Sequence, residues 1–198
     1  MNKESSTKDL SLTSNERLFL ESISTFRPRK YHNLNPKGLK IFTFNAGFKK
    51  RLNDLLIIIF DKSVNSAVVY SKTSTPSAPI IWDKKYNKGK VKVLVVNSGN
   101  ANAHTGEMGL KIINDYVHYI CQNLGCSKNE VLVSSTGVIG EKFDPTLIIQ
   151  KISKINNNKK KDLLEAAKSI MTTDTYPKVL IKKIKVEDKN VSIYGFAK

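Results

Sequence analysis

Three segments of this sequence place hydroxyl-bearing and small residues directly after apolar runs. One of them is residues 134–140, Ser-Ser-Thr-Gly-Val-Ile-Gly, which follow the apolar run 131–133. A threonine hydroxyl and the backbone N–H groups beside a glycine are donors with which an oxyanion hole stabilises a tetrahedral intermediate. Thr136 and Gly137 are therefore candidate catalytic residues for oxyanion stabilisation. A glycine turn with a capping threonine is the alternative interpretation of the same residues.

The other two segments carry amides, hydroxyls and a carboxylate. Residues 97–106, Asn-Ser-Gly-Asn-Ala-Asn-Ala-His-Thr-Gly, follow the largely apolar stretch 91–96. Small residues let a backbone approach another chain or a ligand closely, and asparagine amides can hold irregular backbone. An ordinary strand-to-helix turn would also use these residues. Residues 171–175, Met-Thr-Thr-Asp-Thr, could cap a helix end or bind a polar substrate.

The elements that must position these segments follow from apolar spacing. Apolar positions three and four residues apart predict a helix that ends near Gly125, a residue typical of C-terminal caps. Continuous apolar runs predict strands that are buried on both faces. Strands are expected at 41–44, 55–60, 66–70, 91–96 and 131–133, helices at 110–124, 145–152 and 161–171, and a closing hairpin at 179–186 and 191–196. Residues 73–79, rich in Ser, Thr and Pro, are expected to form a loop. The fold class predicted from this order is mixed α/β.

The amino-terminal residues differ from the rest in composition. Residues 1–35 are polar and end in a Pro- and Asn-containing stretch, so we expect an extension and linker before a folded domain at 36–198. Capping-box spacing at residues 13–16 favours a short helix within this extension. No apolar run is long enough for a membrane span, and the first 25 residues show no secretory signal. The expected location is cytoplasmic.

The net charge of +16 raises the question of a nucleic-acid partner. Only Arg17, Arg27, Arg29 and Arg51 are arginines, while the lysines are spread along the whole chain. This distribution favours solvated lysine faces and no nucleic acid, although a basic nucleic-acid-binding or scaffold protein stays an alternative. The two cysteines lie five residues apart without zinc-ligand neighbours, so we expect no metal.

Taken together, the segments resemble one known family. Residues 97–106 resemble the N-S-G-N-A-N-A-x-T-G signature of the bifunctional glutamate N-acetyltransferase/ornithine acetyltransferase family of arginine biosynthesis. Residues 135–141 look like its S-T-G-V-I-G element, residues 171–175 like its M-T-T-D element, and residues 195–198 like its G-x-A-K element. The resemblance covers roughly residues 36–198, with the elements in the family's order.

This resemblance implies a fold and an activity. The fold is an α/β sandwich shared with DmpA-type aminopeptidases, of which this chain would supply the amino-terminal part. The enzyme is an acyltransferase that moves an acetyl group from N-acetylornithine to a threonine nucleophile and then to glutamate. No cofactor is implied, although bifunctional members also accept acetyl-CoA as a co-substrate. A DmpA-like peptidase with an N-terminal nucleophile is the alternative enzyme.

The resemblance also implies roles for individual residues. Thr136 and Gly137 match the family's oxyanion-stabilising pair, and Thr172 and Lys198 match substrate-binding residues. The family's precursor cleaves itself before a threonine in an A-T-M-L element that follows G-x-A-K. We therefore expect this chain to be an alpha-chain portion that is inactive alone. Its expected partner is a beta chain, in a heterotetramer of two alpha and two beta chains.

Overall fold

The computed structural model describes residues 34–198. The helix predicted after residue 13 and nearly all of the predicted extension lie outside the described residues. Leu34 is already packed in the core, with 6% of its surface exposed. The domain start at residue 36 stays a prediction.

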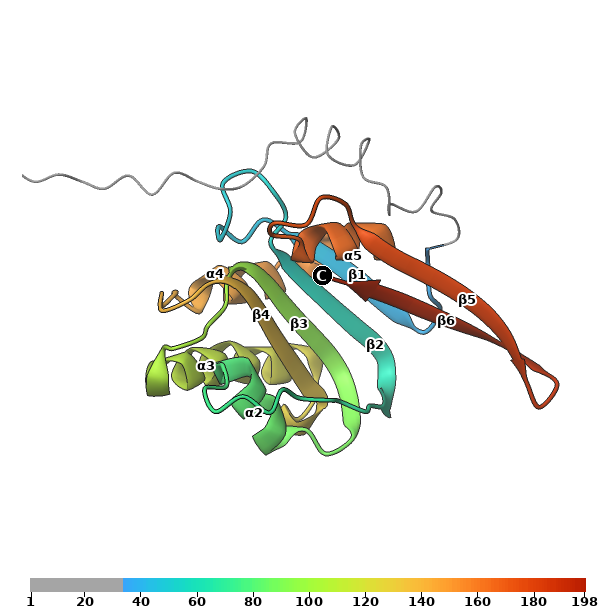
Figure 1. The fold of residues 1–198 in the computed structure, drawn as a ribbon, viewed down its shortest axis with the longest axis horizontal. Helices are drawn as coiled ribbons and strands as arrows, with labels where there is room; N and C mark the ends of the chain where they lie inside the picture. Colours follow the sequence, from blue (N-terminus) through green and yellow to red (C-terminus); the bar gives the residue numbers. More distant parts are fainter. Residues whose placement is uncertain (1–33) are drawn as a thin grey trace, which may run out of the picture.

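A four-stranded sheet forms the centre of the molecule (Figure 1). Its strands are β1 (Leu39–Phe44), β2 (Leu55–Asn65), β3 (Lys90–Asn100) and β4 (Val131–Val138), in that spatial order. The first three strands pair antiparallel, whereas β3 and β4 run parallel. A separate antiparallel hairpin is formed by β5 (Lys178–Val186) and β6 (Lys189–Ala197). The hairpin predicted from the sequence is thus confirmed.

Within residues 34–198, four α-helices accompany the sheets. They are α2 (Ala78–Tyr86), α3 (Gly106–Leu124), α4 (Thr146–Ile152) and α5 (Leu163–Ile170), and single 3-10 turns lie at Lys128–Glu130 and Ile155–Asn157. The predicted long helix is confirmed as α3, which buries Ile113, Val117 and Ile120. It ends at Gly125, whose left-handed backbone (φ 61°) is the conformation that glycine adopts without strain.

The central sheet has a core on each face. Helices α2, α3 and α4 cover one face over Ile57 and Val95, while α5 and the β5–β6 hairpin cover the other over Leu56 and Ile58 (Figure 1). Residues 55–58 of β2 are buried on both faces, as predicted. In β3, the side chains of the α5 face, such as Leu94, are only partly buried. The predicted α/β class is confirmed.

Between β2 and β3, one prediction was wrong and another was confirmed except at its last two residues. The strand predicted at 66–70 does not form: β2 ends at Asn65, and Val69 is 98% exposed. Its β-branched residues favour a strand only where a neighbouring strand offers hydrogen bonds, and the described residues provide none there. The loop predicted at 73–79 gives way to helix α2 at Ala78, where Pro79 occupies the first turn. Among the described residues, no helix is long and apolar enough to cross a membrane.

Candidate active site

The first two sequence segments meet where β3 and β4 end. The parallel register places Ser98 opposite Thr136 and Gly99 opposite Gly137. Beyond the strands the backbones stay joined, because the amide of Ala101 donates to the carbonyl of Val138 at 2.8 Å. Two segments almost 40 positions apart in the sequence therefore form one surface at the carboxyl ends of parallel strands.

Asparagine side chains support this surface from within. The Asn97 amide donates to the carbonyl of Asn100 at 2.8 Å, and the Asn100 amide donates to the carbonyl of Glu141 at 2.9 Å. Asn102, which has a left-handed backbone (φ 43°), donates to the carbonyl of Gly109 at 3.1 Å. The expectation that these amides hold irregular backbone is confirmed. Their role here is to fix the shape of the strand ends.

Gly137 lies where the backbone at the end of β3 leaves no room for a side chain on β4. Its φ is 137°, and a Cβ placed on it would lie 2.2 Å from the carbonyl carbon of Gly99. No side chain fits in that space, so glycine is required by both conformation and contact. Gly137 is exposed and the neighbouring Thr136 is half-buried, on the outermost strand of the central sheet.

Thr136 presents a hydroxyl on the face of the sheet that α5 covers. Paired residues of parallel strands point to the same face, and Ser98, its partner, points toward α5. Within residues 34–198, the Thr136 hydroxyl makes no hydrogen bond. It is therefore available to donate to an oxygen atom of a bound ligand.

The third segment and the chain end form a second cluster, built around Asp174. One carboxylate oxygen of Asp174 accepts a hydrogen bond from the amide of Thr172 at 3.2 Å and lies 3.5 Å from the ammonium of Lys198. The other oxygen is paired with Lys178. Burial alone would raise the pKa of Asp174, but the hydrogen bonds from Lys178 and Thr172 and the charge of Lys198 outweigh it and lower that pKa.

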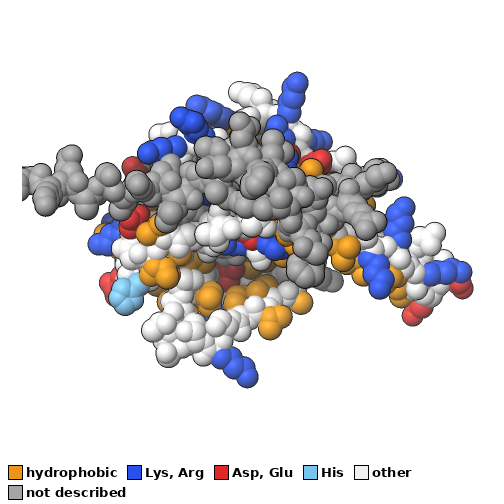
Figure 2. Space-filling view, turned by 45° about the horizontal axis from the view of Figure 1, so that its top comes forward, with side chains coloured by type: hydrophobic (Ala, Val, Ile, Leu, Met, Phe, Trp, Pro, Cys, Tyr) orange, Lys and Arg blue, Asp and Glu red, His pale blue; other side chains and the backbone are white. Residues whose placement is uncertain are grey.

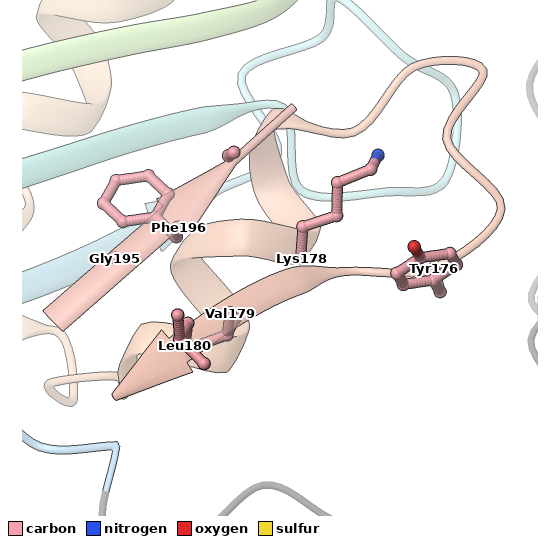
Figure 3. Close-up of a pocket in the computed structure, with 7 residues that line it drawn as sticks. Tyr176, Lys178, Val179, Leu180, Gly195 and Phe196 are labelled. Atoms are coloured by element: carbon pink, nitrogen blue, oxygen red, sulfur yellow. The ribbon is translucent and has the colours of Figure 1, made fainter. Parts of the chain in front are cut away.

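This cluster has a net positive charge, because two lysines face one carboxylate. Such a site suits a substrate that carries a carboxylate of its own. A groove of about 430 Å³ adjoins the cluster along the start of the hairpin, and Lys178 reaches from its rim toward the loop before β5 (Figure 3). The groove is lined by Tyr176, Lys178, Val179, Leu180, Gly195, Phe196 and Ala197.

The two clusters are linked through helix α5. The hydroxyl of Ser98, the neighbour of Thr136 in the sheet, donates to the carbonyl of Ser169 at 2.6 Å. Ser169 lies in the last turn of α5, and the chain continues from there to Thr172. The structure thus brings Thr172 and Lys198 together through Asp174 and connects this cluster to the strand end of Thr136 and Gly137 through buried contacts.

Sequence reasoning noted the carboxylate of residues 171–175 but did not include Asp174 among the candidate site residues. A signal in the sequence was available, since Asp174 is the only carboxylate in residues 171–175.

Within the described part of the chain, no group of three His, Cys, Asp or Glu side chains could hold a metal ion.

Residues 40–198 match the sequence profile of the ArgJ family. This chain belongs to the ArgJ family. The arginine biosynthesis bifunctional protein ArgJ of Mesorhizobium japonicum is 42% identical over 181 residues, covering 89% of this chain and 44% of the relative. The mitochondrial ArgJ protein of Dictyostelium discoideum is 36% identical over 194 residues, covering 93% of this chain and 44% of the relative. The chain thus spans less than half the length of these curated relatives.

Solved ArgJ structures share the fold. The crystal structure of ArgJ from Bacillus halodurans superposes with a TM-score of 0.74 at 29% identity, over 81% of this chain and 86% of that one. Ornithine acetyltransferase from Mycobacterium tuberculosis, solved in complex with ornithine, gives a TM-score of 0.73 at 25% identity, over 83% and 89%. The predicted family and fold are confirmed, and these findings do not favour the peptidase or the nucleic-acid alternative. The roles of Thr136, Gly137, Thr172 and Lys198 stay predictions.

The basic side chains of this ArgJ-family chain are spread over its surface, as they are along its sequence. On the face shown in Figure 2, Lys and Arg side chains are scattered over several elements and do not gather into one patch. A nucleic-acid site usually concentrates such charges on one face or along one element. On this face, the high net charge therefore supplies no specific argument for a nucleic-acid partner.

Proposed function

We propose that this chain is the amino-terminal, alpha-chain part of an enzyme that transfers an acetyl group from N-acetylornithine to glutamate in arginine biosynthesis. The family match over residues 40–198 carries this proposal. The relatives' names place them in arginine biosynthesis, and one solved neighbour is an ornithine acetyltransferase with bound ornithine.

The geometry supports the proposal with two matching subsites. Thr136 and Gly137 lie at an accessible strand end, where a hydroxyl and a backbone N–H can stabilise the oxyanion of acetyl transfer. Thr172 and Lys198 converge on Asp174, where the excess positive charge attracts the α-carboxylate of an amino acid. An acetyl donor bound across both subsites would have its carboxylate and its acetyl carbonyl anchored separately.

The nucleophile, in this proposal, is a threonine released by self-cleavage beyond Lys198. The lengths of the relatives support such a cut. This chain covers 44% of the curated relative from Mesorhizobium japonicum but 86% and 89% of the two crystallised chains, so those crystals contain chains of about this extent. The proposed assembly is a heterotetramer of two alpha and two beta chains in the cytoplasm. It needs no cofactor, and acetyl-CoA is proposed only as a second acetyl donor.

A first test is the sequence encoded immediately after Lys198. An Ala-Thr-Met-Leu element there supports the nucleophile assignment, and its absence contradicts it. The second test is acetyl exchange between N-acetylornithine and isotope-labelled glutamate, followed by chromatography, in the complete protein and in the 198 residues alone. We expect exchange in the complete protein and none in the isolated chain. A folded complete protein without exchange activity would overturn the proposal. The same assay with acetyl-CoA in place of N-acetylornithine shows whether the enzyme accepts acetyl-CoA as an acetyl donor.

A further inference from the structure

Lys49 lies in the loop between β1 and β2, and its charged side chain is buried. Only 8% of its surface is exposed. A buried ammonium is unfavourable unless hydrogen bonds and opposite charge compensate for the lost water. The Nζ of Lys49 donates to the hydroxyl of Ser98 at 2.5 Å and to the carbonyl of Met171 at 2.5 Å. These partners lie 49 and 122 positions away in the sequence.

Asp54 fixes the loop that carries Lys49. Its carboxylate is fully buried and accepts the amides of Ala46 at 2.6 Å and of Lys49 at 2.7 Å. Burial raises the pKa of Asp54, while these hydrogen bonds and the charge of Lys49 act in the opposite direction. The carbonyl of Asp54 also accepts the amide of Ser98 at 2.7 Å. These hydrogen bonds therefore anchor the loop to the end of β3 independently of the contacts that the Lys49 side chain makes.

Both of these acceptors, Ser98 and Met171, belong to the candidate active site, one to each of its halves. Ser98 is the neighbour of Thr136 in the parallel ladder. Met171 is followed by Thr172, whose amide is held by Asp174. One ammonium thus joins the oxyanion strand to the substrate-binding segment, at a place where Ser98 also bonds to the end of α5.

We infer that Lys49 is a positioning residue that sets the distance between the oxyanion pair at Thr136 and the substrate-binding segment at Thr172. A hydrogen-bonded ammonium suits this task, because it offers three donors at one point and can satisfy acceptors from separate elements. The contact itself is independent of the proposed function. Its effect on catalysis rests on that proposal.

Hydrogen exchange tests the contact without requiring activity. In Lys49→Met, the backbone amides of residues 97–100 and 170–174 should exchange about tenfold faster or more, because the lost charge-assisted hydrogen bonds no longer resist local opening. Amides of helix α3 should exchange at the wild-type rate. Lys62→Met, at an exposed lysine of β2, is the matched control and should leave both segments unchanged. If Lys49→Met does not fold, Lys49→Gln, which keeps a hydrogen-bond donor but carries no charge, is judged by the same criterion.

Kinetics of the complete protein test the positioning role. Lys49→Met should raise KM for N-acetylornithine, because Thr172 is then no longer held in place to bind the substrate. Adding Lys49→Met to Thr172→Ala should raise KM no further, because both changes remove the same contact between Thr172 and the substrate. An unchanged exchange rate at residues 170–174 in a folded variant would contradict the claim that Lys49 holds this segment in place. Faster exchange with strictly additive effects on KM would overturn the positioning role. An inactive wild-type protein would contradict the proposed function, while the exchange result still decides whether Lys49 holds the segments together.

Discussion

At the scale of single residues, some members of the candidate site could be predicted from the sequence and others could not. Thr136, Gly137, Thr172 and Lys198 stand in segments of unusual composition, so their positions could be predicted from the sequence together with the family resemblance. Lys49 could not be predicted, because it is one of many lysines and its partners lie far away in the sequence. A buried charge is recognisable only once the fold shows what surrounds it.

The hydroxyl of Thr136 should matter for turnover more than for binding. In the complete protein, Thr136→Ala should lower kcat by about 10²–10³-fold, the usual effect of losing one oxyanion donor. KM should change much less, because the oxyanion forms only after the substrate has bound, as the reaction passes through the tetrahedral intermediate. Thr136→Ser, which keeps the hydroxyl, is the control. A wild-type kcat for the alanine variant in steady-state assays would remove Thr136 from the mechanism.

Lys198 should act mainly on substrate affinity. Lys198→Met leaves Asp174 paired with Lys178 alone, so the cluster loses its excess positive charge. KM for N-acetylornithine or glutamate should rise by about tenfold or more, the size expected for one lost charge-assisted hydrogen bond. Lys189→Met, at the far end of the hairpin, should leave KM unchanged. An unaltered KM in Lys198→Met would contradict the assignment of Lys198 to the substrate.

At the scale of elements, the sequence predicted most helices and strands, including the short helices α4 and α5, but it did not predict helix α2. Helix α3 has a sustained apolar stripe and a glycine cap, so its sequence specifies it locally. Helix α2 has nine residues and buries Trp82 beside Asp83, a combination that no apolar periodicity reveals. Residues 66–70 have the composition of a strand but no strand beside them in the described structure, and pairing is a property of the whole sheet.

The junction of β3 and β4 should be intolerant of a single added methyl group. Gly137→Ala introduces a Cβ within 2.5 Å of the Gly99 backbone and forces alanine into a conformation that L residues rarely adopt. We expect a loss in the free energy of unfolding of about 3 kcal/mol or more. Gly125→Ala shares the positive φ but meets no atoms, so it should cost only about 1–2 kcal/mol. Urea denaturation of both variants checks this order, and equal losses would contradict the close approach.

Asp83 links helix α2 to the edge of β4 and should make stability depend on pH. Its carboxylate accepts the amide of Val133 at 3.1 Å, and burial raises its pKa from 3.8 to about 7. The folded state therefore holds this proton more tightly than the unfolded state. The stability contributed here is greatest below about pH 4, falls as pH rises toward 7, and is constant above that.

Asp83→Asn should remove this dependence, because its side-chain oxygen still accepts the Val133 amide and carries no charge. Urea denaturation at pH 5 and pH 8 should show that the wild type loses stability between these values by more than the variant does. At pH 8 the variant should be the more stable protein, by on the order of 2 kcal/mol. A variant that is less stable than the wild type at pH 8 would contradict the raised pKa.

At the scale of the whole molecule, the β5–β6 hairpin leaves apolar side chains in contact with solvent. Leu180 is 70% exposed and Ile193 is 49% exposed, and both point to the hairpin face opposite the core, with Val186 and Val191 also exposed. Exposed apolar strands favour association with other chains.

This face should govern the self-association of the isolated chain. Leu180→Thr combined with Ile193→Thr places a β-branched residue suited to strands at both positions and removes apolar surface. The monomer fraction of the double variant, measured by light scattering, should exceed that of the wild type. Lys183→Thr, on the opposite face of the hairpin, is the control. Equal association of the double variant and the wild type would show that this face is not responsible.

The close approach of Gly137 to Gly99 has a genetic consequence. The atoms that a Cβ at residue 137 would strike are the carbonyl carbon and oxygen of Gly99 and the amide nitrogen of Asn100. All three belong to the main chain, and every amino acid at residues 99 and 100 would place them there. A screen for second-site suppressors of Gly137→Ala should therefore recover none at either position. Revertants should restore glycine at residue 137 itself.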